Sequence, residues 1–217
     1  MVQSFPMPLA EFWSPLRVAS LSLGLPAAAE MSRTAGGEIT IAELGARLWS
    51  ARVTLAPIGI ESAAALQVKL RLLQRAGATL FVSPRIGDYP ARDPNGVIAA
   101  SNATIASLPV GNQTLSLAGL PSGYTLSAGD YLSFSYGNPA IQAFHQLVGD
   151  AHADAAGIVP AFEIVPQLRP GALVGASVTL VKPAFRALML PGSLNEGSLQ
   201  RTRLAGITFD LIQTLKA

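Results

Sequence analysis

The residues of this chain with the clearest potential for chemistry lie together in one short stretch. Asp150, His152 and Asp154 alternate with alanines, and His145 lies just upstream. On an extended strand, residues two apart share a face, so these side chains could converge on a metal ion. The alternative is a polar turn between two strands. Because the chain has only two histidines and no fourth ligand at a fixed spacing, we expect the turn and no metal site.

Other catalytic patterns are missing from the sequence. No serine lies in a Gly-x-Ser-x-Gly elbow, and the absence of cysteine excludes a thiol nucleophile and disulfides. The stretch from Gly171 to Gly175 lacks the Gly-x-Gly start of a dinucleotide-binding loop. The thirteen acidic residues have no spacing that identifies a glycosidase carboxylate pair. We therefore expect a protein that is not an enzyme and has no cofactor.

The composition points to contacts with other protein subunits. The chain has 217 residues, enough for one large or two small domains, and half of them are hydrophobic while only 13% are charged. A soluble monomer usually carries more charge, so we expect apolar surface to face neighbouring subunits. No apolar run is long enough for a membrane span, and no signal-peptide pattern is present. Basic residues are scattered, which argues against dedicated nucleic-acid binding.

A strand, a helix and a second strand between Arg47 and Pro84 organise the chain. From Arg47 to Leu55, residues Trp49, Ala51, Val53 and Leu55 share one face, as in a half-buried strand. Ser62 is the expected N-cap of a helix that ends at Gly77. Ala63, Leu66, Leu70 and Leu73 recur at helical spacing, and we expect them to pack on the chain's own sheet.

The segment before this unit reads as an apolar arm followed by a meander. Prolines restrict Phe5–Leu16 to a short, broken helix or an extended arm. Arg17–Gly24 alternates like a strand, and we expect Ala28–Arg33 to pair back onto it. Gly36 and Gly37 then predict a turn into Glu38–Ile41.

The rest of the chain predicts further β-structure. Turn-forming residues between 84 and 96 indicate a domain boundary or a projecting loop. Short strands between 96 and 183 favour a small barrel or sandwich. The expected fold is therefore mainly β, a barrel or sandwich with one flanking helix. We place a base domain at residues 1–83 and 184–217, with its helix at 62–77, and an inserted β-domain at 84–183.

Several short segments of the sequence resemble segments of a known class of protein. They are Gly37-Glu38, Leu48–Leu55, the helix leading to Gly77 and Phe81, Leu117–Pro121, Ala128–Phe134, Ala153-Asp154 with Gly157, Pro166–Gly171, Lys182-Pro183 and Met189–Ser193. Together they resemble tail-tip proteins encoded by tailed phages and prophages of alphaproteobacteria, and distal tail proteins in particular. The resemblance covers most of the chain, and the matching segments are structural motifs rather than catalytic ones.

This resemblance implies a tube-type β-barrel fold and a hexameric ring in the virion, assembled in the bacterial cytoplasm. The ring would join the tail tube protein to the hub or baseplate protein. The tape measure protein is a further candidate partner, DNA would only pass through the lumen, and no membrane is involved. The base domain would supply the ring contacts, and we expect Arg47, Arg52 and Arg71 at an interface or in the lumen.

Two alternatives stay open at this point. The chain could be a tail tube protein, or a tail-tip module whose inserted domain binds host glycan. A glycan module needs exposed aromatic rings. The available candidates are Tyr124, Tyr131, Phe134, Tyr136 and Phe144. Tyr131, Phe134 and Tyr136 do not all share one face of a strand, so some of them are expected in the core.

Overall fold

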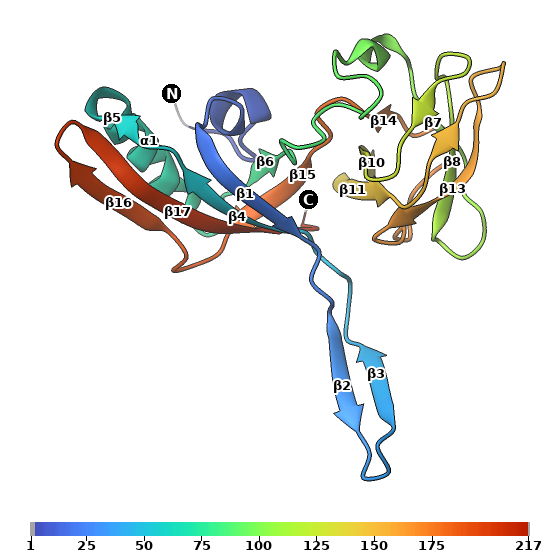
Figure 1. Ribbon diagram of the computed structural model, residues 1–217, viewed down its shortest axis with the longest axis horizontal. Helices are drawn as coiled ribbons and strands as arrows, with labels where there is room; N and C mark the ends of the chain where they lie inside the picture. Colours follow the sequence, from blue (N-terminus) through green and yellow to red (C-terminus); the bar gives the residue numbers. More distant parts are fainter. Residues whose placement is uncertain (1–2, 217) are drawn as a thin grey trace. The chain divides into compact units, whose positions relative to one another are not determined.

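The computed structural model describes residues 3–216 and confirms the expected fold class, a β-rich protein with one α-helix in that range (Figure 1). The chain forms two compact units. We call residues 17–77 and 188–214 the sheet unit. The residues up to Leu16, residues 78–187 and those from Leu215 form the barrel unit. Within the described range, no helix is both long and apolar enough to cross a bilayer.

The units change after Leu16, Gly77, Ala187 and Thr214, whereas the sequence suggested domain boundaries only after residues 83 and 183. The segments up to Leu16 and from 78 to 83 group with the barrel unit, because the N-terminal arm binds the backbone that follows Gly77. The Met7 amide donates to the Thr79 carbonyl oxygen at 2.8 Å. The ring-forming role of the base domain stays a prediction.

The sheet unit is built on an antiparallel sheet. β4 (Ser50–Leu55) lies between β1 (Val18–Gly24) and the long β17 (Arg203–Gln213). The short β5 (Ile58–Gly59) and β16 (Asn195–Gln200) also pair with β17. The period-two pattern of β4 is confirmed, since Trp49, Ala51, Val53 and Leu55 are buried whereas Arg52 is exposed.

The single α-helix of the described chain, α1 (Ile60–Leu73), begins and ends earlier than the predicted range of 62–77. Its N-cap is Gly59 rather than Ser62, because β5 still pairs with β17 at Gly59 and the chain turns directly from that strand into the helix. The last turn tightens, with the Gln74 amide bonded to the Arg71 carbonyl. Gly77, at φ +83°, follows the helix by several residues. Leu70 and Leu73 are buried, as expected.

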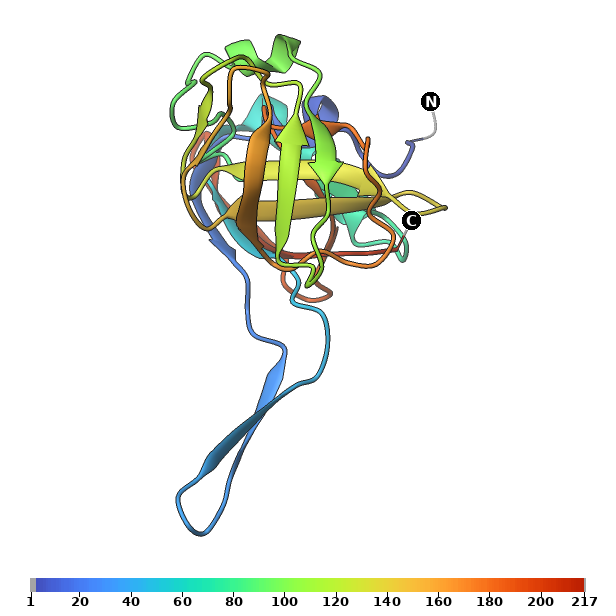
Figure 2. The ribbon, with the colours of Figure 1, turned by 90° about the vertical axis from the view of Figure 1, so that its right-hand side faces the viewer.

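β2 (Ala29–Arg33) and β3 (Ile39–Glu43) form a hairpin of their own. The expectation that residues 28–33 pair back onto the preceding strand was wrong, because β1 pairs with β4 instead. A turn centred on Gly37, at φ +87°, brings Arg33 opposite Ile39 and so closes the hairpin locally. The hairpin continues the β1–β4 ribbon and extends away from it (Figures 1 and 2).

The barrel unit contains a closed six-stranded barrel. Its strands are β7 (Thr104–Ser107), β8 (Thr114–Ala118), β10 (Tyr131–Tyr136), β11 (Ile141–Leu147), β13 (Val159–Val165) and β14 (Val178–Thr179). They follow one another in the order β14-β10-β11-β13-β8-β7. A bridge between Thr104 and Ser177 joins the two ends of this order and closes the barrel. Closure leaves no free sheet edge, and apolar side chains such as Leu115, Leu132 and Val159 fill the interior.

Shorter elements complete the barrel unit. They are the π-helix η1 (Leu9–Trp13), β6 (Leu80–Val82), the 3-10 helix η2 (Val97–Ala100), β9 (Thr125–Leu126), β12 (Ala151–His152) and β15 (Phe185–Met189), which runs across the unit boundary. The N-terminal arm is a short, broken helix, as expected. Trp13 is buried there, and its indole Nε1–H donates to the Ser83 carbonyl oxygen at 3.1 Å.

Candidate interaction surfaces

The residues with metal-ligating potential lie in and around the short strand β12 and bind other groups of their own chain. Asp150 accepts a hydrogen bond from the Ala128 amide at 2.7 Å, and His152 Nδ1 lies 3.0 Å from the Thr125 hydroxyl. Asp154 Oδ1 accepts from the Ile158 amide at 2.9 Å. All three acidic or imidazole side chains are exposed. In residues 3–216, no group of three such side chains is arranged to hold a metal ion.

The second histidine, His145, is a core residue of the barrel. Its ring stacks on Phe134 with 5.6 Å between centroids, and Nδ1 lies 2.7 Å from the Pro166 carbonyl oxygen. Nδ1–H therefore donates to that oxygen. The pKa of His145 is lowered to about 4, chiefly by burial and to a smaller extent by nearby Arg169, while the hydrogen bond to Pro166 acts in the opposite direction. The imidazole is neutral at pH 7 and stabilises the fold.

The three arginines predicted at an interface or in the lumen all belong to the sheet unit, on separate elements. Arg52, on β4, forms a bidentate ion pair with Asp210 of β17, with N···O distances of 2.9 and 3.0 Å. Arg71, on α1, pairs in the same way with Glu196 of β16, at 2.9 and 2.5 Å. These hydrogen bonds lower the pKa of both carboxyl groups.

Arg47 precedes β4 and binds the base of the hairpin. Its Nη2 donates to the Leu25 carbonyl oxygen at 2.8 Å, across the kink between the β1–β4 ribbon and the hairpin. The structure thus gives Arg47, Arg52 and Arg71 partners within their own chain. Their role at an interface or in the lumen stays a prediction.

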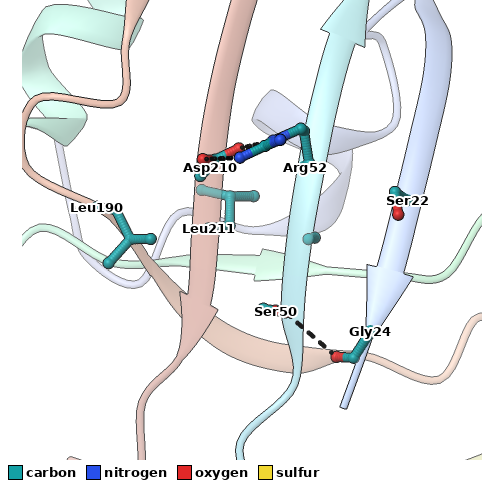
Figure 3. A pocket seen from close by; sticks show the side chains of 8 residues that line it. Ser22, Gly24, Ser50, Arg52, Leu190, Asp210 and Leu211 are labelled. Carbon is teal, nitrogen blue, oxygen red and sulfur yellow. Dashed lines mark hydrogen bonds and ion pairs between the residues drawn. The ribbon is translucent and has the colours of Figure 1, made fainter. Parts of the chain in front are cut away.

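An open groove of about 320 Å³ lies on the polar side of the sheet unit (Figure 3). Its lining residues are Ser22, Gly24, Ser50, Ala51, Arg52, Leu190, Asp210 and Leu211. The charged groups in it, Arg52 and Asp210, point toward each other and form the ion pair described above. Since the remaining lining is small or aliphatic, the groove offers no nucleophile with an adjacent base.

The β2–β3 hairpin presents an exposed apolar face. All ten of its strand residues are exposed, five in each strand. Met31 lies opposite Ile41, and Arg33 lies opposite Ile39. Because opposite residues share a face and neighbours along a strand alternate, one face carries Ala29, Met31, Arg33, Ile39, Ile41 and Glu43. Met31, Ile41 and Ile39 are 68%, 65% and 49% exposed. We call this set the hairpin face.

A second exposed apolar surface lies on the outer side of α1. Ile60, Ala64 and Val68 are four residues apart and therefore neighbours along the helix surface. Ile60 is 49% exposed and Val68 is 63% exposed, while Ala64 is also exposed. We call these three residues the helix stripe. Exposed charges flank it, with Glu61 at the N-terminal end and Arg75 just past the C-terminal end of α1.

Both surfaces were missed by sequence reasoning, which considered only the inner apolar face of the helix. The spacing of 60, 64 and 68 could have shown the stripe. The hairpin face could have been found from the alternation of Met31, Ile39 and Ile41 with polar residues, once the correct pairing was assumed.

The aromatic residues of the barrel do not form an exposed platform. Phe134 and Phe144 are buried in the barrel unit, and Tyr131 stacks on Phe144 with 5.1 Å between centroids. Tyr124, Tyr131 and Tyr136 are half-buried. None of these five residues is exposed, whereas a ring that stacks on a sugar has to be accessible.

Two comparisons with known proteins gave no match for this chain. No protein-family model matches it, and a search of curated proteins found no match. The surfaces described above are therefore interpreted from their own residues.

Proposed function

We propose that this chain is a structural subunit of a homo-oligomeric ring at the tip of a phage tail. In this role it is a distal tail protein that joins the tail tube protein to the hub or baseplate protein. The phage-tail part of the proposal rests on the sequence resemblance. The subunit part rests on the exposed surfaces of the sheet unit, and the hairpin face is the observation that carries it.

The hairpin face is difficult to explain in a monomer. An isolated two-stranded hairpin is marginally stable in water, and here all strand residues are exposed to solvent. Covering Met31, Ile39 and Ile41 would contribute about 1–2 kcal/mol for each side chain, since each is about half to two-thirds exposed. A partner subunit would supply this cover and hold the hairpin in one conformation.

The edge of the sheet supports the same proposal. β1 ends the sheet and pairs with β4 on one side only. Leu21 and Leu23 lie opposite the buried residues Val53 and Ala51, yet both stay half exposed at this edge. Unpaired edge strands with apolar side chains favour pairing with another chain. The low content of charged residues, 13%, agrees with large subunit contacts.

The test is the mass of the purified full chain in solution together with averaged electron-microscope images. We expect a ring of several copies, with six-fold averages for a distal tail ring. A matched variant has a two-residue Asn-Gly turn in place of residues 28–44, which removes the hairpin and keeps the β1–β4 ribbon. This variant should have the mass of a smaller assembly at the same concentration.

A stable monomer at all accessible concentrations would refute the ring. A ring that forms equally well without the hairpin would refute the hairpin face as its basis. Stacked tubes of the purified chain would instead favour a tail tube protein. Because no exposed aromatic platform is present on the five candidate rings, no observation favours the glycan-binding alternative.

A further inference from the structure

We propose that the hairpin face of one copy docks on the helix stripe of a second copy. This inference rests on the proposed function, since it requires a homo-oligomer. It names the two surfaces that meet in the assembly. Both surfaces belong to the sheet unit, and both are exposed within one chain, so neither covers the other in the same copy.

The two surfaces match in length. The strands of the hairpin face extend over four residue steps, from Ala29 to Arg33 and from Ile39 to Glu43, which is about 14 Å. The helix stripe from Ile60 to Val68 extends over eight residue steps, or about 12 Å. Met31 and Ile41 lie at the centre of the hairpin face and Ala64 at the centre of the stripe. The small alanine side chain leaves room there for the two larger ones.

The flanking charges select one direction of docking. Arg33 lies at the tip of the hairpin and Glu43 at its base, on the same face. Glu61 lies at the start of α1 and Arg75 just beyond its end. When the hairpin tip points toward the N-terminus of α1, Arg33 meets Glu61, and Glu43 points along the helix toward the positive charge of Arg75. The reverse direction places like charges together, which disfavours it.

The contact joins two different surfaces, so it is head-to-tail. Each copy offers one hairpin and one helix stripe, and a second copy can bind at each. A head-to-tail contact produces a ring when its rotation closes. The same contact made twice by a pair of copies would give only a dimer. A two-fold pairing of two hairpin faces is the main competing arrangement.

Cysteine cross-linking of the full chain tests this contact cleanly, because the natural sequence has no cysteine. The variant carries Met31→Cys and Val68→Cys, and a short bis-maleimide is added at a concentration where the chain is assembled. We expect a ladder of covalent oligomers on a denaturing gel, with residues 31 and 68 of different copies linked in the mass spectrum. Mixing the two single variants should give covalent dimers and nothing larger.

A matched control replaces Val68→Cys with Val110→Cys, since Val110 is fully exposed on the barrel unit. This pair should give at most a trace of linked species. Cross-linked dimers of Met31→Cys alone would show that two hairpins meet and would overturn the proposal. A link between residues 31 and 68 within one copy would also overturn it.

The cross-linking result separates this inference from the proposed function. A ring seen in images without a 31–68 link would refute the hairpin–helix contact and leave the ring intact. A chain that stays monomeric would refute both. Charge exchange tests the docking direction independently. Arg33→Glu and Glu61→Arg should each weaken association about threefold, as expected for the loss of an exposed ion pair. The double exchange should restore it, and no restoration would count against the docking direction.

Discussion

His145 should make the barrel unit sensitive to acid. In the unfolded chain its pKa is 6.5, whereas burial lowers it to about 4 in the folded protein. The folded state therefore binds fewer protons between these pH values. The contribution of neutral His145 to the free energy of unfolding is fully present above pH 6.5 and is lost as the pH falls toward 4. With about 1.4 kcal/mol for each pKa unit, the loss reaches about 2.5 kcal/mol at pH 4.5.

The test compares the chain with its His145→Leu variant at pH 7.5 and pH 4.5. Urea unfolding would be followed through the fluorescence of Trp13, which is buried in the barrel unit, in a Trp49→Phe background. The variant is less stable at pH 7.5, because the Pro166 carbonyl loses its donor. The decisive quantity is the change in the free energy of unfolding between the two pH values. Carboxyl groups titrate in both proteins, so the difference reports His145.

Between pH 7.5 and pH 4.5, the free energy of unfolding of the unchanged chain should fall by about 2.5 kcal/mol more than that of the His145→Leu variant. His152→Leu is the matched control, since that histidine is exposed on the short strand β12. Its pH response should follow the unchanged chain. Equal pH dependence of the chain and the His145→Leu variant would refute the reasoning that His145 is neutral and buried.

Three further predictions concern packing. Gly157→Ala should destabilise the barrel unit by more than about 2 kcal/mol, because the new Cβ would lie 2.1 Å from the Leu120 carbonyl oxygen and the residue has φ +76°; thermal unfolding measures this. Leu70→Ala should cost about 2–5 kcal/mol of stability, whereas Val68→Ala should change the stability of the isolated chain by less than about 0.5 kcal/mol and weaken its assembly. Tyr124→Phe should leave stability unchanged or raise it by up to about 1 kcal/mol, because the buried Tyr124 hydroxyl has no hydrogen-bond partner and burial raises its pKa to about 12.

Each of these predictions has its own control or contrary result. Gly123 also has positive φ, at +71°, but nothing lies within 4 Å of an added Cβ, so Gly123→Ala should cost clearly less than Gly157→Ala. Equal effects of the Leu70 and Val68 changes would contradict the assignment of inner and outer helix faces. A strong loss of stability in Tyr124→Phe would mean that the hydroxyl makes a bond absent from this structure.

Patterns that depend on neighbouring residues were predictable from the sequence. The alternation around Trp49 and Val53 identified β4 and its buried face, and the helical spacing of Leu70 and Leu73 identified the inner face of α1. These periodicities arise from burial of one side of an element. The polar turn predicted around Asp150, His152 and Asp154 was only partly right, because His152 lies in the short strand β12, paired with Thr125 of β9.

Features that depend on distant residues were not predictable. The start of α1 follows from the pairing of Gly59 with Arg203, far along the chain, so the local N-cap signal at Ser62 was misleading. Closure of the barrel needs the bridge between Thr104 and Ser177, which no short-range pattern reveals. At the hairpin, the local turn at Gly36 and Gly37 into residues 38–41 was predicted correctly, whereas the pairing of residues 28–33 onto the preceding strand was wrong, because β1 pairs with β4 from farther along the chain.

The most direct test of the proposed function is the position of the chain in the virion. Antibody fragments raised against the purified chain would be bound to intact phage particles and located in averaged images. We expect six fragments around the end of the tail tube, at its junction with the hub. Fragments along the whole tube, or particles that contain no copy of the chain, would contradict it.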